Sequence, residues 1–268
     1  MKKFTLYSLH LRRIIHQISL FAAICFLPVS FASAHAVGDT TQPAPPPVTS
    51  PLSTPGMAGP LTINPTPEKF HSGLFGDVYV SGVVSGMWQL QNNTFPGDRS
   101  SQVDLSNGQV FLQKVDGILQ FFVQAGAYSL PDIGLPYVRA GNTYDPVPGA
   151  TNTFYGVVPQ AFIKIAPNNN FSIMAGKLPT LIGAEYTFSF ENMNIERGLL
   201  WNQENAVNRG VQLNGKFGPL AVALSLNDGF YSNQFSWVWG SLTYSINATN
   251  TLALGVAGRL VIDEGVER

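Results

Sequence analysis

Apolar and polar side chains alternate with a period of two along much of this chain. In residues 77–91, Val80, Val84 and Trp88 share one parity, whereas Ser85 and Gln89 share the other. This alternation is typical of a β-strand with one apolar and one polar face. The fifteen residues exceed the roughly 9–11 that a tilted strand needs to cross a bilayer. The pattern therefore predicts a membrane-spanning strand.

The same alternation predicts eight further strands, and their connections alternate between short and long. The short ones include Asp116-Gly117, a two-residue hairpin signal. Short periplasmic turns and long external loops are typical of outer-membrane barrels. We therefore predict an all-β, antiparallel up-and-down transmembrane β-barrel in residues 73–268. The eight further strands are expected at 104–115, 118–128, 155–166, 171–178, 207–216, 220–227, 236–246 and 251–261, with long connections at 92–103, 129–154, 179–206 and 228–235.

The parity of each strand also predicts which side chains face the inside of the barrel. Polar residues should face the lumen and aliphatic or aromatic residues the lipid, because barrels alternate in this way. The expected lumen-facing residues are Gln120, Gln124, Gln160, Lys164 and Gln212. The expected lipid-facing residues are Val80, Val84, Trp88, Phe121, Val123 and Leu224.

The number of strands suggests that the barrel is incomplete. Bacterial barrels have even strand numbers, but the pattern shows about nine strands, and the last residues, 263–268, do not form a strand that ends in an aromatic residue. We expect an open sheet edge and interpret the sequence as the N-terminal portion of a longer barrel. The alternative is one strand that the pattern missed.

The N-terminal residues have the layout of a secretory signal peptide. Residues 1–17 carry a net positive charge, and residues 18–31 are mostly apolar. Ala32-Ser33-Ala34 is a small-x-small cleavage pattern. We predict a cleavable signal peptide at 1–34 and export to the outer membrane; the alternatives are cleavage after Ala36 or an uncleaved anchor. The only cysteine, Cys25, lies inside this leader, and the proline-rich residues 35–72 are expected to form a flexible segment.

Composition excludes some classes of partner. Charged residues make up 12% of the chain, about half the usual share for a soluble domain. Four of the fifteen basic residues lie in the leader. The rest of the chain has eleven basic and sixteen acidic residues, which gives it a net charge of −5. No basic patch remains, and we expect no nucleic-acid partner. The expected partners are outer-membrane lipid and small hydrophilic solutes or ions, and a homo-oligomer stays open.

Aromatic residues gather near the expected strand ends. They are either an interfacial girdle, as barrels often carry, or ordinary core residues, and the sequence does not decide between the two. The residues concerned are Tyr128, Phe154, Tyr155, Tyr231, Phe235, Trp237 and Trp239.

Residues 176–213 carry the most individual pattern of the chain. Gly176-Lys177 is followed by Thr180, Gly183 and Glu185, then by Arg197-Gly198 and by Gly210-Val211. This pattern resembles the β-barrel porins of the OmpL-like family, over about residues 73–268. The resemblance implies a passive channel for small hydrophilic solutes and does not specify the solute.

The chain lacks the residues for most enzymatic sites. Three of its four histidines lie within residues 1–35, and His71 precedes the first expected strand, so catalytic triads and zinc sites lack partners. A carboxylate pair remains conceivable among the acids of the long connection 179–206, but solvated loop acids explain them more simply. We expect no enzyme, no cofactor and no metal.

The long connection 179–206 is the strongest candidate for a functional element. Its 28 residues hold Glu185, Glu191, Glu196 and Glu204 together with Arg197, and long loops in compact folds are usually functional. We predict that it folds into the lumen, where Glu185, Glu191 and Glu196 form a negative constriction opposed or braced by Arg197.

Arg209 would join this constriction only at the rim, because its parity points outward. Charged side chains at the narrowest point set pore selectivity, so a modest preference for cations is expected. Two alternatives remain. The connection covers the outside, with Arg197 paired to Glu196 or Glu191, or the whole protein is a structural or adhesive barrel with a blocked lumen.

Overall fold

The structure is a computed structural model that describes residues 59–141, 151, 155–229 and 231–260. The predicted signal peptide at 1–34, including Cys25, and most of the proline-rich segment lie outside the described residues, as do residues 261–268. In the described part of the chain, no helix is long and apolar enough to cross a membrane.

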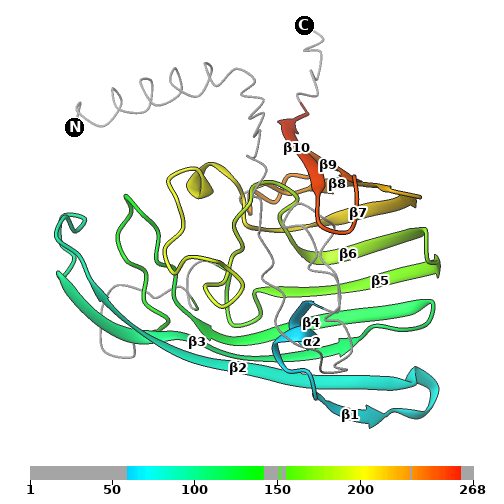
Figure 1. Cartoon of the computed structure of the whole chain (residues 1–268), viewed down its shortest axis with the longest axis horizontal. Helices are drawn as coiled ribbons and strands as arrows, with labels where there is room; N and C mark the ends of the chain where they lie inside the picture. The colour runs from blue at the N-terminus through cyan, green and yellow to red at the C-terminus, as the bar shows by residue number, and fades with distance from the viewer. Residues whose placement is uncertain (1–58, 142–150, 152–154, 230, 261–268) are drawn as a thin grey trace, which may run out of the picture.

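Ten antiparallel strands form one sheet in which every strand pairs with its neighbour in sequence (Figure 1). The described residues leave β1 and β10 without a pairing to each other, so the sheet is open. The predicted all-β, up-and-down architecture of an incomplete barrel is confirmed. The strands are β1 (Glu68–His71), β2 (Asp77–Leu90), β3 (Ser101–Lys114), β4 (Leu119–Tyr128), β5 (Gln160–Asn168), β6 (Phe171–Pro179), β7 (Val207–Phe217), β8 (Leu220–Asn227), β9 (Trp237–Ser245) and β10 (Thr251–Arg259). The helical elements are α2 (Gly59–Ile63), η2 (Gly73–Phe75) and η3 (Trp201–Gln203).

The structure has one strand more than the alternation pattern predicts. The additional strand, β1, lies in the segment expected to be a flexible spacer, and its four residues are all exposed. Lys69 Nζ and His71 Nδ1 contact the carboxylate of Asp77 on β2 at 2.9 and 3.1 Å. Polar contacts to β2 therefore hold this strand, which is too short to show an alternation.

Short turns and long connections lie at opposite ends of the sheet. The β3–β4, β5–β6 and β7–β8 turns gather at the right of Figure 1, and the β2–β3 connection lies at the left. At the β3–β4 turn, Gly117 has a φ of +73°, which suits the Asp-Gly hairpin signal because glycine tolerates positive φ. Lys114 Nζ contacts Asp116 Oδ1 at 2.6 Å and braces this turn.

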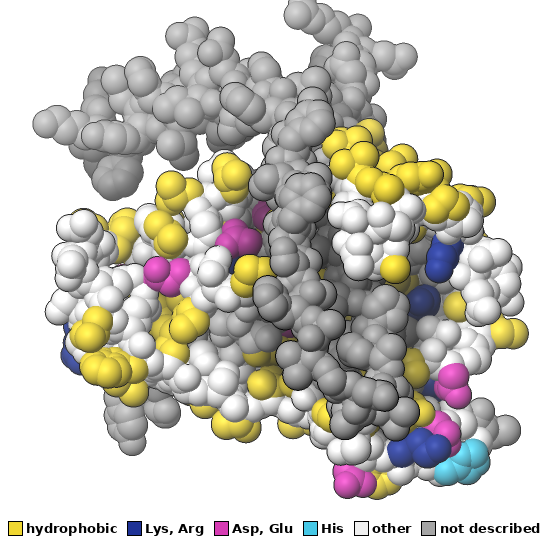
Figure 2. Space-filling model, in the orientation of Figure 1, with side chains coloured by type: hydrophobic (Ala, Val, Ile, Leu, Met, Phe, Trp, Pro, Cys, Tyr) yellow, Lys and Arg dark blue, Asp and Glu magenta, His cyan; other side chains and the backbone are white. Residues whose placement is uncertain are grey.

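The two faces of the sheet differ sharply in chemistry. The outer face is apolar and exposed: Val84 is 84% and Trp88 68% exposed. Figure 2 shows such hydrophobic side chains at the upper right, where β8–β10 lie, whereas charged side chains gather at the lower right near β1. The inner face is buried and rich in amides and hydroxyls. A soluble protein would bury its apolar face, whereas this distribution matches a barrel in lipid.

A β-bulge adjusts the alternation where β2 meets β3. The register shifts between Ser85 and Gly86, and both Ser106 and Asn107 on β3 are buried. A bulge places two residues of one strand opposite one of the other. The parity of β3 therefore changes partway, and polar side chains stay on the inner face on both sides of the bulge.

Two of the aromatic residues near the strand ends are not girdle residues. Tyr128 and Trp239 are almost completely buried on the inner face, where Trp239 packs against Leu181 and Ala223. The core interpretation is therefore the correct one for these two residues. Phe154 lies outside the described residues.

Candidate functional site

The five residues expected to face the lumen all lie on the inner face of the sheet. In the β4–β5 register, Gln120 is opposite Lys164 and Gln124 is opposite Gln160. Gln124 is 1% and Gln212 0% exposed, Gln160 is buried, and Gln120 and Lys164 are partly buried. That this face borders an aqueous lumen stays a prediction.

Uncharged hydrogen-bonding groups link neighbouring strands across the inner face. Gln124 Nε2 donates to Oε1 of Gln109, and Gln109 Nε2 donates to Asn107 Oδ1 over 3.1 Å. Asn107 Nδ2 in turn donates to Ser85 Oγ over 3.0 Å. This series of hydrogen bonds spans β2, β3 and β4. The amides are therefore held in fixed orientations without any charged partner.

A second network of the same kind joins β6 and β7. Gln212 Nε2 donates to Asn214 Oδ1 over 2.7 Å, and Asn214 Nδ2 donates to Ser172 Oγ over 3.1 Å. The same chemistry thus recurs on two separate parts of the sheet. Neutral amides and hydroxyls, rather than ion pairs, dominate the described inner face.

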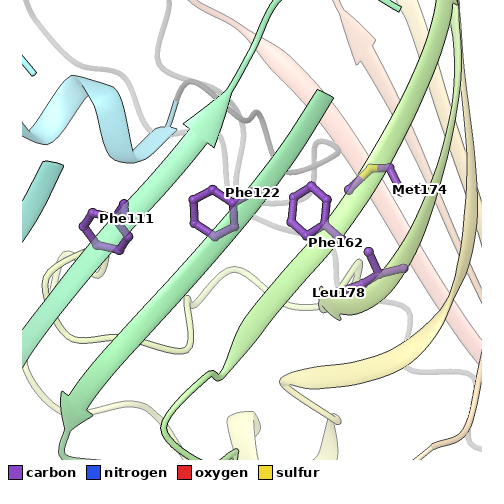
Figure 3. Close-up of a cluster of buried hydrophobic side chains, with 5 residues drawn as sticks. All are labelled: Phe111, Phe122, Phe162, Met174 and Leu178. Carbon is purple, nitrogen blue, oxygen red and sulfur yellow. The ribbon is translucent and has the colours of Figure 1, made fainter. Parts of the chain in front are cut away.

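Three phenylalanine rings form a row across the inner face. Phe111, Phe122 and Phe162 come from the adjacent strands β3, β4 and β5, with ring centroids 6.2 and 5.4 Å apart (Figure 3). Phe190 lies against this row, with its ring 5.7 Å from that of Phe111. Phe190 belongs to the long connection between β6 and β7, residues 180–206, which we call the β6–β7 loop. This loop therefore packs on the inner face.

Residues 188–190 anchor the β6–β7 loop to β3 and β4. The ring of Phe188 meets that of Tyr128 edge-on at 5.1 Å, and Asn107 Nδ2 donates to Ser189 Oγ over 2.9 Å. The loop therefore combines apolar and polar contacts with the inner face. It does not simply cover the outer side of the sheet.

Local hydrogen bonds shape this part of the loop into a closed turn. The side chain of Asn192 accepts from the backbone N–H of Tyr186 over 2.6 Å and donates to its carbonyl oxygen over 2.7 Å. Asparagine commonly bonds to nearby backbone in this way. The turn places Phe188 and Phe190 at its tip, where they reach the sheet.

Arg197 fastens the loop to a second long connection, residues 129–159 between β4 and β5. Its side chain is completely buried; Nε donates to Asp132 Oδ1 and Nη1 to the carbonyl oxygen of Thr187. Its guanidinium carbon also lies 5.4 Å from the centre of the Trp201 ring. The ion pair with Glu196 or Glu191 considered above is therefore wrong, because the acidic partner is Asp132.

Two of the three constriction acids have neutral partners. Both carboxylate oxygens of Glu185 accept from the backbone N–H of Gly198, at 2.9 and 3.0 Å. Glu196 Oε1 accepts from Nε2 of Gln89 and of Gln91, at the end of β2. These contacts orient both carboxylates without neutralising them.

The third constriction acid, Glu191, differs from these two. Its burial in the folded loop raises the pKa of its carboxyl group to about 8. Burial likewise raises the pKa of Glu204 to about 8, and the nearby charge of Glu185 adds to this rise. Both groups are therefore mostly protonated at neutral pH, and Glu191 does not supply there the negative charge that the constriction prediction assigns to it.

Arg209 lies apart from this acidic group. Its Nε donates to Asp228 Oδ2 over 2.7 Å, Nη2 donates to Asn233 Oδ1 over 2.7 Å, and its guanidinium carbon lies 5.1 Å from the centre of the Tyr231 ring. It thus ties the start of β7 to the β8–β9 connection. The structure does not bring Arg209 to the acids of the β6–β7 loop.

Sequence reasoning missed the contribution of Asp132. It lies in another long connection, 65 positions from Arg197, and no local pattern links the two. Of the acids considered above for a carboxylate pair, Glu185 lies near enough to Glu204 for its charge to affect the Glu204 carboxyl group. Among the described residues, however, no group of three or more His, Cys, Asp or Glu side chains is placed to hold a metal ion.

Comparison with known proteins identifies the family. The family model described as "Putative beta-barrel porin-2, OmpL-like" matches residues 77–259, well over half of the chain. No curated protein and no solved structure matches. The matched range extends from the start of β2 to the end of β10. The chain therefore belongs to the OmpL-like β-barrel porin family.

Proposed function

We propose that this protein is an outer-membrane channel through which small hydrophilic solutes diffuse passively. The observation that carries the proposal is the segregation of the two sheet faces: exposed aliphatic and aromatic residues outside, and buried amides and hydroxyls inside. A lipid-facing apolar band and a polar interior distinguish membrane barrels. Family membership supports the same conclusion.

In this proposal the long connections face the external medium, as in other outer-membrane barrels. The β6–β7 loop then narrows the channel from that side, because it packs on the inner face through Phe188 and Phe190. Glu185 and Glu196 carry the negative charge of the narrowed region, which favours cations modestly. Glu191 joins them only above about pH 8, when its carboxyl group ionises.

A second candidate function is a structural or adhesive barrel whose lumen is blocked. One observation favours it: the phenylalanine row of the inner face is almost completely buried and Phe190 packs on it. In that case the external loops, rather than the lumen, are the functional part. The two candidates differ in whether the inserted protein passes solutes.

Liposome swelling separates the two candidates. The full-length protein is expressed, purified from the outer-membrane fraction of the host and reconstituted into vesicles loaded with a large dextran. On dilution into isotonic glycerol or arabinose, a diffusion channel gives rapid swelling, and the rate falls with larger sugars such as raffinose. Vesicles that contain correctly inserted protein and still do not swell in glycerol would overturn the channel proposal and favour the blocked barrel.

A further inference from the structure

Two adjoining cavities open where three connections meet at the long-loop end of the sheet. The larger has a volume of about 500 Å³ and is lined by residues 91–96, 132–135 and Glu196. The smaller, about 420 Å³, is lined by residues 89–91, Ile133 and 194–196. They share Gln91, Ile133 and Glu196, and we call them together the mouth pocket. Each falls within the usual size of a small-molecule site, about 300–1,000 Å³.

The mouth pocket contains one uncompensated negative charge. Asp132 lines it, but the buried Arg197 guanidinium neutralises that carboxylate. Glu196 also lines it and is held by the neutral amides of Gln89 and Gln91. Among the described residues no cation lies within salt-bridge distance of Glu196. This carboxylate is thus oriented in advance and remains a strong hydrogen-bond acceptor.

The remaining lining combines neutral polar groups with flat apolar ones. Asn92, Asn93 and Thr94 offer amide and hydroxyl groups, which both donate and accept hydrogen bonds. Phe95 is 38% exposed, and Ile133 and Leu135 are exposed as well. A site with a few convergent polar groups beside apolar surface is typical of small-molecule recognition.

This combination matches the chemistry of a saccharide. A sugar ring has hydroxyl groups around its edge, which need acceptors and donors, and C–H groups on its faces, which pack on an aromatic ring. A cationic solute would use the charge of Glu196 and the amide oxygens but would leave the N–H donors of Asn92 and Asn93 without partners. An anionic solute would be repelled by Glu196.

The inner face of the sheet next to the pocket has the same neutral character. Gln89 lies on the inner face of β2, and the amide chain that includes Asn107, Gln109 and Gln124 follows on the neighbouring strands. These three amides are buried and bonded to one another and to Ser85 and Ser189. The polar groups that follow Gln89 on the inner face are therefore uncharged, like most of the pocket lining.

We propose that the mouth pocket is a recognition site for neutral polyhydroxylated solutes, namely monosaccharides and short oligosaccharides, which are bound before passage. The proposal rests on the proposed channel function, since it names the solute class that the channel favours. Glu196 accepts hydrogen bonds from sugar hydroxyls, Asn92 and Asn93 complete the polar contacts, and Phe95 packs on one face of the sugar.

Isothermal titration of the full-length protein in detergent micelles tests the site directly. The probes are maltotriose as the neutral saccharide, spermidine as the cation and gluconate as the anion. We expect saturable binding of maltotriose, and no comparable binding of the other two. Absence of saturable maltotriose binding, or tighter binding of spermidine, would overturn the proposal.

Matched variants locate the binding. Glu196→Gln keeps the size of the side chain but removes its charge, and Phe95→Ala removes the ring; each should weaken maltotriose binding about tenfold, the effect expected from one charged hydrogen bond or one stacked ring. Glu68→Gln, on the exposed β1, and Phe235→Ala, an exposed aromatic of another connection, should leave it unchanged. Equal affinity in all four variants would place the site elsewhere and overturn the assignment.

The binding experiment tests the saccharide site, and the swelling experiment tests the channel independently of it. Vesicles that swell in glycerol while micellar protein binds no maltotriose would leave the channel standing and overturn the saccharide site. Maltotriose binding that Glu196→Gln and Phe95→Ala weaken, in a protein that gives no swelling, would support the site and overturn the channel.

Discussion

The buried guanidinium of Arg197 donates through Nε to Oδ1 of Asp132, which lies 65 positions earlier in the sequence, and so joins two long connections. The backbones meet at the same place: Arg197 N donates to the carbonyl oxygen of Pro131 over 3.0 Å, and Ile133 N donates to that of Arg197 over 2.9 Å. One ion pair and two backbone hydrogen bonds therefore position the β6–β7 loop. We expect this contact, together with those of residues 188–190, to hold the loop on the inner face.

Replacing Arg197 with Met should release the loop. The change leaves the Asp132 carboxylate buried without its cation, and breaking a buried pair in this way typically costs about 3–5 kcal/mol. We expect proteinase K to cut within residues 180–206 at least tenfold faster in Arg197→Met than in the wild type, as measured by mass spectrometry. Lys216→Met, which removes an exposed cation near the β7–β8 turn, is the control. Equal cleavage rates for Arg197→Met and the wild type would show that the ion pair does not hold the loop.

The docking of the loop should weaken as the pH rises. Burial raises the pKa of Glu191 and of Glu204 to about 8 in the folded loop, whereas an ordinary glutamate ionises near pH 4.5. A raised folded-state pKa means that the stabilisation is fully present below about pH 4.5 and is lost as the pH rises through about 8. The loop should therefore be cut several-fold faster at pH 9 than at pH 6.

Glu191→Gln supplies the matched test of this pH dependence. The amide cannot ionise, so the variant should resist proteinase K better than the wild type, and the difference should be larger at pH 9 than at pH 6, because the loss of stabilisation in the wild type accumulates between about pH 4.5 and 8. Comparing the two proteins at each pH cancels the pH dependence of the protease itself. Glu68→Gln should follow the wild type throughout. A wild-type-to-variant ratio that stays constant from pH 6 to pH 9 would contradict the assignment.

The acids of the loop should also determine ion selectivity. Replacing Glu185, Glu191 and Glu196 together with Gln should move the reversal potential in a salt gradient towards that of a non-selective pore. Glu191→Gln alone should have little effect at pH 7 and a clear effect at pH 9, because Glu191 ionises between these values. An unchanged reversal potential in the triple variant would mean that the loop is not the selective region.

The fold itself should be sensitive at Gly126 on β4. This residue has a φ of +142°, and a Cβ there would lie 2.2 Å from the carbonyl oxygen of Gly108 and 2.7 Å from Gln109 Cα on β3. Backbone in such a conformation costs a non-glycine residue about 1–3 kcal/mol, and the contact with β3 adds to this. Gly126→Ala should therefore reduce the folded, heat-modifiable band on gels. Gly258→Ala, where a Cβ meets nothing within 4 Å, should fold normally; equal folded fractions would contradict the constraint.

The strands and the parity of their side chains follow from sequence because they depend on near neighbours. The alternation over residues 77–91 predicts one strand, and β2 spans Asp77–Leu90. Gln124 and Gln212 lie on the inner face, as their alternation with aliphatic residues predicts. The alternation of apolar and polar residues does not predict β1, because its four residues are all exposed and polar contacts to Asp77 hold the strand.

The arrangement of the site could not be derived in the same way. The alternation places Phe122 on the inner face with Gln124, but the stacking of Phe122 on Phe111 and Phe162 depends on the register of three strands. The partner of Arg197 depends on how two long connections fold together. The same fold partly buries Glu191 and raises the pKa of its carboxyl group to about 8, which cannot be inferred from its position in an acidic segment.

Single-channel conductance in planar bilayers tests the central claim, that this barrel conducts and that the β6–β7 loop narrows it. The wild-type protein is compared with a variant in which residues 183–203 are replaced by a short Gly-Ser linker, and insertion of both is verified by the heat-modifiable band. We predict discrete conductance steps for the wild type and larger steps for the shortened variant, because the loop packs on the inner face. Wild-type protein that inserts and yet gives no conductance steps would contradict this account.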